Sequence, residues 1–239
     1  MRGCLIFILF ISLFACQNNH SENYLLVPRV KANTLSIDGQ LNEIFWKNAA
    51  SITSLQNFFD TSEWHNKTEI LLAYDDSYLY LAAQLQNEDI KAEFTQRDSK
   101  IYLEHCFEFF IDPGNDQRDY YEFEVNANSA VWDLILKSSD RKVLGRPENI
   151  KEWHVPNDYF KVLVDGTLND SDDTDRAWQF EMCMPWSLIA EGKPKHGDLW
   201  KANFMRVDYE RNQPQIFAWR TTGTESIHVP EKWGYLKFQ

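Results

Sequence analysis

Hydrophobic and polar residues alternate along residues 104–128, in two runs separated by a short acidic loop. The apolar positions are Phe107, Phe109, Ile111, Tyr121, Phe123 and Val125. The polar positions in phase with one another are Glu108, Asp112, Glu122, Glu124 and Asn126. Because successive side chains of a strand point to opposite faces, this pattern predicts two neighbouring strands with one apolar face and one row of carboxylates and amides. That polar row is an acid/base site, a ligand-binding wall or a solvated surface.

Comparable apolar-rich runs follow along most of the chain, about 8–15 residues apart, as in antiparallel β-proteins. Residues 68–86 predict a hairpin that turns at Asp75-Asp76-Ser77. Further strands are predicted at 130–137, 159–168, 176–184, 199–210, 215–222 and 233–238.

Helical patterns are few. Residues 41–49 predict two helical turns with Ile44, Phe45 and Ala49 inward, and Pro185 predicts the start of a second short helix. The whole pattern predicts an all-β fold, an antiparallel β-sandwich with one or two short helices.

Composition narrows the possible partners. The 239 residues suit one domain, with no internal repeat, and the formal net charge of −12 argues against nucleic acid or an anionic membrane surface as a partner. Aromatic residues make up 15% of the chain and include nine Trp. Such residues fill a sandwich core or form platforms on which sugars and other ligands stack.

Residues 1–16 resemble a bacterial lipoprotein signal peptide. Arg2 precedes the apolar run "LIFILFISLFA", which is too short to span a bilayer, and Cys16 follows a small residue. The alternative is a secretory signal cut near Ala15, with Cys16 unmodified. The lipoprotein is favoured because the polar residues 17–27 suit a tether, and Gln17 after Cys16 indicates the outer membrane. A single domain is then expected over residues 28–239.

Two cysteines, Cys106 and Cys183, remain in the expected domain, and we expect them to be unpaired. No Cys/His spacing predicts zinc. Two loops, 112–119 and 165–175, are dense in Asp and Asn, the oxygen ligands that Ca²⁺ requires. Their residues are candidates for a structural calcium site or are solvated turns. The candidate ligands are Asp112, Asp116 and Asp119.

Seven phrases occur in the order found in family 9 carbohydrate-binding modules, and residues 28–239 resemble that family. They are "LSIDGQLNEIFWKNA", "TEILLAYDDSYLYLAAQL", "EFFIDP", "YYEFEVNA", "WQFEMCMPWSLI", "GDLWKANFMRV" and "PEKWGYLKF". The resemblance implies a β-sandwich of DOMON-like topology. Characterised members bind sugars, often at chain ends, between two stacked aromatic side chains.

The resemblance also implies site residues, with departures. Tyr102 stands where the family has its first aromatic platform, and Glu108 and Asn126 match polar ligands. Glu124 stands where the family has a sugar-binding Arg, and Ile227 where it has the second platform Trp. Half of the aromatic clamp and one cation are therefore absent at the expected places.

Further candidates come from the residues themselves. Arg206 is expected to provide the counter-charge for the carboxylate row, or else to form a buried structural ion pair with Glu108. Arg97 and Asp98 precede Tyr102 and are expected near the same mouth, or are ordinary polar loop residues.

Three further rings are candidates. Trp132 is either an exposed platform or a core residue after a bulge. Trp219, followed by Arg220, either replaces the missing platform or packs in the core, which is the commoner place for a Trp. His228 offers a ring face or a hydrogen bond, or is a surface residue.

These features favour a non-catalytic glycan-binding lipoprotein of the cell envelope that takes part in polysaccharide breakdown, with other envelope glycan-utilisation proteins as partners. A second hypothesis is a glycoside hydrolase that uses Glu108 and Glu124. A third is a haem or redox carrier, because DOMON-like sandwiches include haem binders. Its candidate ligands are Met182, Met184, Met205, His105 and His228.

Overall fold

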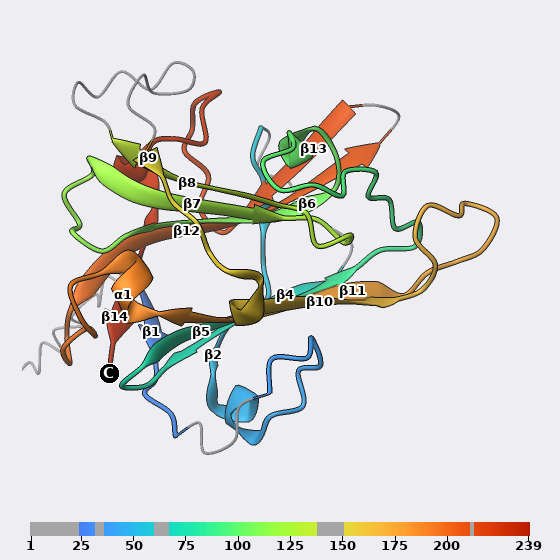
Figure 1. The fold of residues 1–239 in the computed structure, drawn as a ribbon. Coiled ribbons are helices and arrows are strands. Elements are labelled where there is room, and N and C mark those ends of the chain that lie inside the picture. The colour runs from blue at the N-terminus through green and yellow to red at the C-terminus, as the bar shows by residue number, and fades with distance from the viewer. Residues whose placement is uncertain (1–23, 32–35, 60–66, 138–150, 211–212) are drawn as a thin grey trace, which may run out of the picture.

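Two β-sheets pack face to face in the computed structural model, which describes residues 24–31, 36–59, 67–137, 151–210 and 213–239 (Figure 1). The nine-stranded sheet runs β1 (Tyr24–Val27), β14 (Gly234–Phe238), β12 (Leu199–Glu210), β6 (Cys106–Asp112), β7 (Asp119–Val125), β8 (Val131–Lys137) and β9 (Lys151–Glu152). On the same side as β14, strand β12 also pairs with a second strand, β13 (Gln213–Ala218). β13 in turn pairs with β3 (Gln56–Asn57).

The five-stranded sheet runs β10 (Phe160–Asp165), β11 (Ala177–Pro185), β5 (Tyr78–Gln86), β4 (Thr68–Tyr74) and β2 (Ala50–Ile52). Neighbouring strands pair antiparallel, except that β1 and β14 are parallel. The predicted antiparallel β-sandwich and the hairpin at Asp75-Asp76-Ser77 are confirmed.

The main core lies between the two sheets. On β6 and β7 the odd-numbered residues point inward, so that Phe109 stacks on Phe123 with ring centroids 5.2 Å apart. Phe180 and Trp178 of β11 meet them from the opposite sheet. The alternation read from the sequence therefore specifies the inner face correctly.

The outer face of the nine-stranded sheet is also buried. A second apolar cluster covers it, and we call this the outer-face cluster. It consists of Phe58, Ile101, Phe110, Tyr120, Ala130, Trp132, Leu134, Leu136, Met205, Ala218 and Trp233. The residues of the polar row of β6 and β7 are each 5% exposed or less, so the row is not a solvated surface.

The helices are shorter than predicted. The α-helix α1 (Trp186–Ile189) begins after Pro185 as expected, and the other turns are 3₁₀. They are η1 (Ile44–Asn48), η2 (Ile101–Leu103), η3 (Asn157–Tyr159) and η4 (Pro230–Lys232). The prediction of two helical turns over 41–49 is wrong in length. Phe45 is buried as expected, but Trp46 is buried as well and Ile44 is 76% exposed.

A buried carboxylate explains that facing. Glu181 on β11 accepts hydrogen bonds from the backbone N–H groups of Asp38 and Gly39 and from the indole N–H of Trp46. The segment can make these contacts only with Trp46 inward. Burial raises the pKa of Glu181 to about 7.

The first strand begins inside the segment predicted as a tether. Residues 24–27 pair with β14 from Tyr24↔Tyr235 to Val27↔Phe238, so the last four residues of the predicted 17–27 tether belong to the sheet. The rest of the predicted tether lies outside the described residues, as does the predicted signal with Cys16. Within the described ranges no helix is long and apolar enough to cross a membrane. Cys106 and Cys183 are buried and unpaired, as expected.

Trp219 lies in the inner core and requires a glycine beside it. Its ring packs against Phe204, with centroids 5.8 Å apart, and a Cβ placed on Gly234 would come within 2.5 Å of the indole. The expectation that Trp219 replaces a missing ligand platform is wrong, because Trp219 points between the sheets.

We predict that Gly234→Ala destabilises the protein by about 1–3 kcal/mol, since the indole has no room to move without straining the core. Urea unfolding would measure the loss. The control is Gly114→Ala, where the nearest atom to a new Cβ lies 3.5 Å away. Equal stability of Gly234→Ala and the wild type would show that the core around Trp219 is not tightly packed.

Candidate functional site

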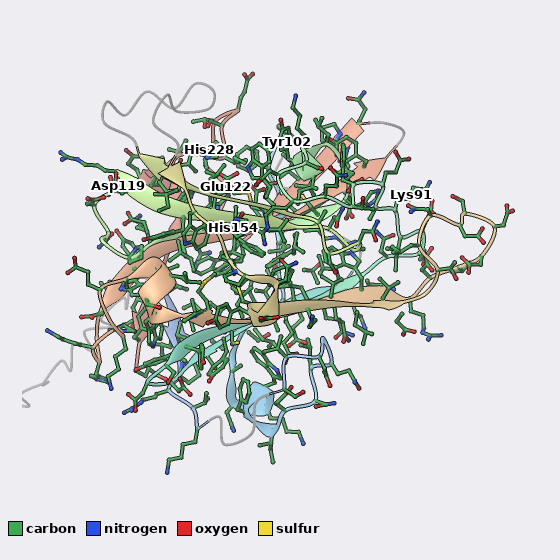
Figure 2. The ribbon with its side chains drawn as sticks, in the orientation of Figure 1. Lys91, Tyr102, Asp119, Glu122, His154 and His228 are labelled. Atoms are coloured by element: carbon green, nitrogen blue, oxygen red, sulfur yellow. The ribbon has the colours of Figure 1, made fainter. Side chains whose placement is uncertain are left out.

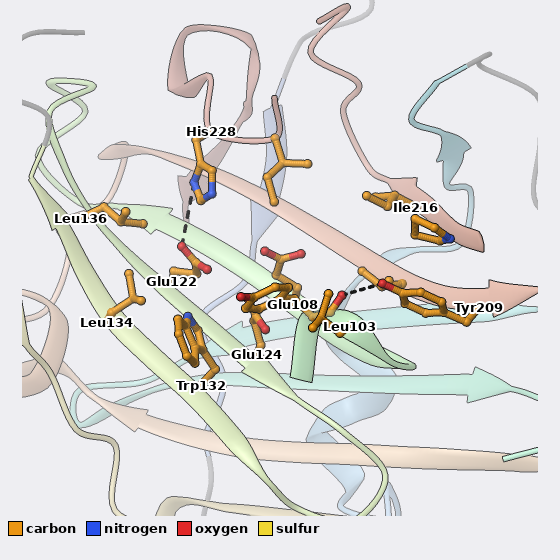
Figure 3. Close-up of a pocket in the computed structure, with 14 residues that line it drawn as sticks. Leu103, Glu108, Glu122, Glu124, Trp132, Leu134, Leu136, Tyr209, Ile216 and His228 are labelled. Atoms are coloured by element: carbon orange, nitrogen blue, oxygen red, sulfur yellow. Dashed lines mark hydrogen bonds and ion pairs between the residues drawn. The ribbon is translucent and has the colours of Figure 1, made fainter. Parts of the chain in front are cut away.

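Three glutamates from two neighbouring strands meet on the outer face of the nine-stranded sheet. Glu108 of β6 and Glu124 of β7 are directly opposite each other in the register, and Glu122 is two residues before Glu124 on the same face. One carboxylate oxygen from each lies within 4.8 Å of the other two. We call these three residues the glutamate floor. Figure 3 shows their carboxylates converging, with Trp132 beside them.

A pocket of about 410 Å³ opens above the glutamate floor. Trp132, Leu134 and Leu136 of β8 form one wall, since they alternate outward along the strand. The remaining wall and rim residues are Tyr102, Leu103, Val207, Tyr209, Pro214, Ile216, Ile227 and His228. A pocket with carboxylates below and mostly carbon walls suits a small organic ligand.

The two predicted rings Tyr102 and Trp132 lie together in this pocket. Their rings meet edge to face, with centroids 5.6 Å apart, and Tyr102 is 37% exposed. Trp132 pairs with Glu124 in an unbroken register, so the strand has no bulge there. Trp132 is therefore neither an exposed platform nor a displaced core residue. It is a buried wall of the pocket, 6% exposed.

The electrostatics of the floor are unusual. Glu108 is 2% exposed, and its Oε1 atom has no hydrogen-bond partner among the described residues. Burial raises the pKa of the Glu108 carboxyl well above its usual range, and the neighbouring charge of Glu122 raises it further. The described lining of the pocket contains no Lys or Arg. The floor therefore holds acid groups close together in an apolar setting.

His228 lies at the edge of the floor. Its Nδ1 atom is 3.1 Å from the Tyr120 hydroxyl. The same atom is 3.9 Å from a Glu122 oxygen, the pair joined by a dashed line in Figure 3. Trp233 holds the loop that carries His228, because its indole N–H donates to the Ile227 carbonyl and its ring stacks on Phe110. The structure thus places His228 where a ligand in the pocket would meet it.

Asn126 has a supporting position rather than a place in the pocket lining. Its amide N–H groups donate to Glu104 and to the Phe94 carbonyl, and its oxygen accepts the Ala130 backbone N–H. Glu104 in turn accepts the backbone N–H of Glu93. These bonds fix the loop that leads into η2 and Tyr102. The expected direct contact between Asn126 and a ligand is wrong, because the side chain is fully buried in that network.

Arg206 lies on the opposite face of the sheet from the glutamate floor. It pairs with Phe107, whereas Met205 pairs with Glu108, and a shift of one residue reverses the face. Its guanidinium forms an ion pair with Asp208 and donates to the Gln86 carbonyl and the Thr68 hydroxyl in the other sheet. Both expectations for Arg206, as counter-charge and as ion-pair partner of Glu108, are therefore wrong.

Arg97 is likewise structural. Its guanidinium pairs with Asp133 at 2.7 Å and donates to the Val155 carbonyl and the Asn157 side chain. These bonds tie the loop after β9 to β8. Arg97 does not line the pocket, so its expected place at the mouth is wrong.

The three carboxylates proposed as calcium ligands do not form a three-ligand group. Within the described residues, the glutamate floor is the one group of three or more acidic or His/Cys ligand atoms close enough to share an ion. Asp116 accepts the Arg118 backbone N–H as a local turn, Asp112 accepts that of Gln117, and Asp119 is exposed. Figure 2 shows Asp119 at the end of the sheet, away from Tyr102. Asp112 and Asp116 lie near each other, and burial and the charge of Asp116 raise the pKa of Asp112, but the three carboxylates do not form one group.

The second acidic loop is held by its own buried aspartate. Asp175 accepts the backbone N–H groups of Ile90 and Thr167, which closes residues 166–175 onto the neighbouring loop. The carboxylate thus serves the loop's backbone.

The haem hypothesis gains no support from the described geometry. Met182 and Met184 pack between the sheets, and Met205 belongs to the outer-face cluster. His105 hydrogen-bonds with Asp208 through Nδ1, and His228 with Tyr120. All five side chains are used in packing or in hydrogen bonds between elements.

Sequence reasoning missed part of the site. Glu122 was read as part of the polar row but not as a site residue, and it completes the floor. Its position two residues before Glu124, on the same face of the strand, is the available signal. The walls Leu134, Leu136 and Ile216 carried no such signal, because aliphatic residues on strands usually pack in a core.

The clustered carboxylates predict a pH-dependent stability. Because the pKa of Glu108 is raised in the folded protein, its contribution is complete below the usual value of 4.5 and is lost as the pH rises through the raised value. We expect Glu122→Gln to reduce this loss and to be about 1 kcal/mol more stable than the wild type near pH 8, since one repelling charge is removed. Urea unfolding at several pH values checks it. An identical decline in variant and wild type would contradict mutual repulsion in the floor.

Comparisons with known proteins agree with the architecture. A family model described as carbohydrate-binding family 9 matches residues 39–238. No curated protein matches the chain. A structure from Bacteroides uniformis ATCC 8492, of a protein with a proposed carbohydrate-binding role, is 17% identical with a TM-score of 0.69, and the match covers 90% of this chain and 99% of that one.

Two structures of a family 9 carbohydrate-binding module from Caldicellulosiruptor kristjanssonii are also similar. The complex with cellotriose is 15% identical, with a TM-score of 0.58 over 90% of this chain and 93% of that one. The complex with glucose is 14% identical, with a TM-score of 0.55 over 90% and 95%. Identities this low show a shared fold, whereas the family model spans most of the sequence. The chain therefore belongs to carbohydrate-binding family 9.

Proposed function

We propose that this protein binds a carbohydrate without cleaving it, in the pocket above the glutamate floor. The observation that carries the proposal is the meeting of aromatic walls and buried carboxylates in one cavity of about 410 Å³. Sugars are recognised by flat rings against their C–H faces and by polar groups that bond their hydroxyls. Family membership and the cellotriose and glucose complexes of the similar structures support this assignment.

The geometry of the floor favours binding over hydrolysis. Glycosidases place their two carboxyl groups on either side of the scissile bond. Glu108 and Glu124 instead rise from adjacent strands of the same floor, and each is 2% exposed. A bond lying on this floor would have both groups on one side. They are therefore suited to receive hydrogen bonds from a bound ligand.

Replacing either of the pocket rings should weaken glycan binding. We expect Trp132→Ala and Tyr102→Ala each to weaken binding by about tenfold or more, because each removes a contact surface for the ligand. Native affinity electrophoresis against plant, algal and host polysaccharides, with reducing ends assayed in the same gel slices, measures both binding and cleavage.

A distant substitution serves as the control. Leu163→Ala removes a side chain that is 40% exposed, close to the 37% of Tyr102, but on β10 in the other sheet. It should leave retardation unchanged. New reducing ends that depend on Glu124 would instead make the protein an enzyme, and no retardation by any glycan would refute the proposed function.

We further propose that the protein acts at the cell envelope, held to the outer membrane by a lipid on Cys16, where it recruits polysaccharide for breakdown. The support is the signal-like pattern of residues 1–16. The apolar run is followed at once by a cysteine and a polar segment, and lipid attachment adds membrane affinity through buried methylene groups.

Removing the cysteine tests this anchoring. We expect Cys16→Ser to abolish fatty-acid labelling of the protein in a bacterial host and to shift it from the membrane to the soluble fraction. Cys106→Ser is the matched control and should keep both label and location, since Cys106 is buried in the domain. Unlabelled wild-type protein in the soluble fraction would contradict the anchor.

A further inference from the structure

The glutamate floor gathers three acidic groups, for which a neutral ligand brings no counter-charge. Three carboxyl groups offer oxygens within 4.8 Å of one another, and their exposed fractions are 2%, 5% and 2% for Glu108, Glu122 and Glu124. An ionised carboxylate that is buried among apolar groups needs a compensating charge or must keep a proton. The described lining supplies neither Lys nor Arg, and its one basic side chain, His228, lies 3.9 Å from a Glu122 oxygen.

One buried oxygen of the glutamate floor can accept a hydrogen bond from a ligand. Glu108 Oε1 is buried and has no hydrogen-bond partner, although buried carboxylate oxygens are normally paired. Glu108 is also part of the pocket lining, so a donor that occupies the pocket can reach it. The floor thus has a place for a positively charged hydrogen-bond donor.

We propose that the pocket recognises an amino sugar with a free primary amine, whose ammonium group donates to Glu108, Glu122 and Glu124. The sugar part of this inference rests on the proposed function. A primary ammonium carries three N–H donors, which is one for each carboxylate of the floor. Such charge-assisted hydrogen bonds are about twice as strong as those between neutral groups.

The walls favour an organic cation over a bare metal ion. Ca²⁺ takes six to eight oxygen ligands, whereas the cavity beside the floor is lined largely by carbon, from Trp132, Leu134 and Ile216. A sugar ring fills that apolar space while its ammonium lies on the floor. The face of Trp132 adds attraction for a nearby cation.

The charge also distinguishes an amino sugar from a neutral one. A hydroxyl group can donate to one glutamate but brings no charge, so the mutual repulsion of the floor remains. Burial and Glu122 raise the pKa of Glu108, and a bound ammonium would favour its ionised form again. A bound ammonium would therefore offset the mutual repulsion of the three carboxylates, which destabilises the protein when no ligand is bound.

Isothermal titration calorimetry on the purified protein tests the inference with three trisaccharides of the same linkage. They are chitotriose with free amines, its N-acetylated counterpart and cellotriose, which differ in the group at one ring position. We expect the free-amine trimer to bind at least tenfold more tightly than the other two. Glu122→Gln should lower that affinity about tenfold, the loss of one charged hydrogen bond, and change cellotriose affinity less than twofold.

The matched control is Glu69→Gln, which removes a carboxylate from β4 in the other sheet and should change nothing. This control matters because a net charge of −12 attracts any cation weakly. Glu124→Gln gives a second variant of the floor, and urea unfolding confirms that each variant is folded.

The outcomes separate the two proposals. Equal binding of cellotriose and the free-amine trimer refutes the ammonium site and leaves carbohydrate binding intact. If 1,5-diaminopentane binds as tightly as the free-amine trimer, the amino-sugar inference is wrong. It is also wrong if Ca²⁺ is the one ligand that binds and Glu122→Gln abolishes Ca²⁺ binding. If no trisaccharide and no polysaccharide of the panel binds, the proposed function itself fails.

Discussion

The burial of carboxylates on a sheet face that is covered by hydrophobic side chains is the constraint on which the site depends. An antiparallel sheet commonly leaves one face to water, and its polar residues then need no partner. Here the glutamates of β6 and β7 are buried beside the outer-face cluster, so each polar group there needs a hydrogen bond, a proton or a ligand. The loops that carry Tyr102 and His228 complete this cover, and they form the pocket in doing so.

Several other buried charges in the described residues are paired and link parts of the fold. Arg206 and Asp208 link the two sheets, and Arg97 and Asp133 tie a loop to β8. Glu181 receives three N–H donors and holds the Asp-Gly segment on the five-stranded sheet. Glu43, Asp112 and Arg220 also have a buried atom without a hydrogen-bond partner among the described residues, but of these four residues only Glu108 lines the pocket. Proteins accept such a cost mainly where a function needs it.

The shared fold and the pocket chemistry are separate properties of this chain. The β-sandwich is shared with proteins that are 14–17% identical. Core packing requires only apolar residues at alternate positions, which many sequences satisfy. Ligand preference depends on a few side chains on the outer face of the sheet, away from the core. A change of one charge among them alters which ligand binds without altering the fold.

The sequence by itself determined the strands, the sandwich and the family. The period-two alternation of β6, β7 and β12 is local, and it specifies which residues point inward without any knowledge of the partner strand. Glu108 and Glu124 could be placed on one face for the same reason. The Asp-Gly segment and the Pro185 helix start are also local signals.

Only the tertiary structure decided how the loops and sheets meet. Arg206 and Met205 are neighbours in sequence, and the register alone sends Arg206 between the sheets and Met205 toward the outer face. Asn126 and Arg97 look like ligands in isolation, but contacts with residues 22 and 36 positions away make them supports. The exposure of Trp132 depends on loops that close over it from distant parts of the chain. Local patterns fix which face a side chain occupies, whereas long-range packing fixes what that face meets.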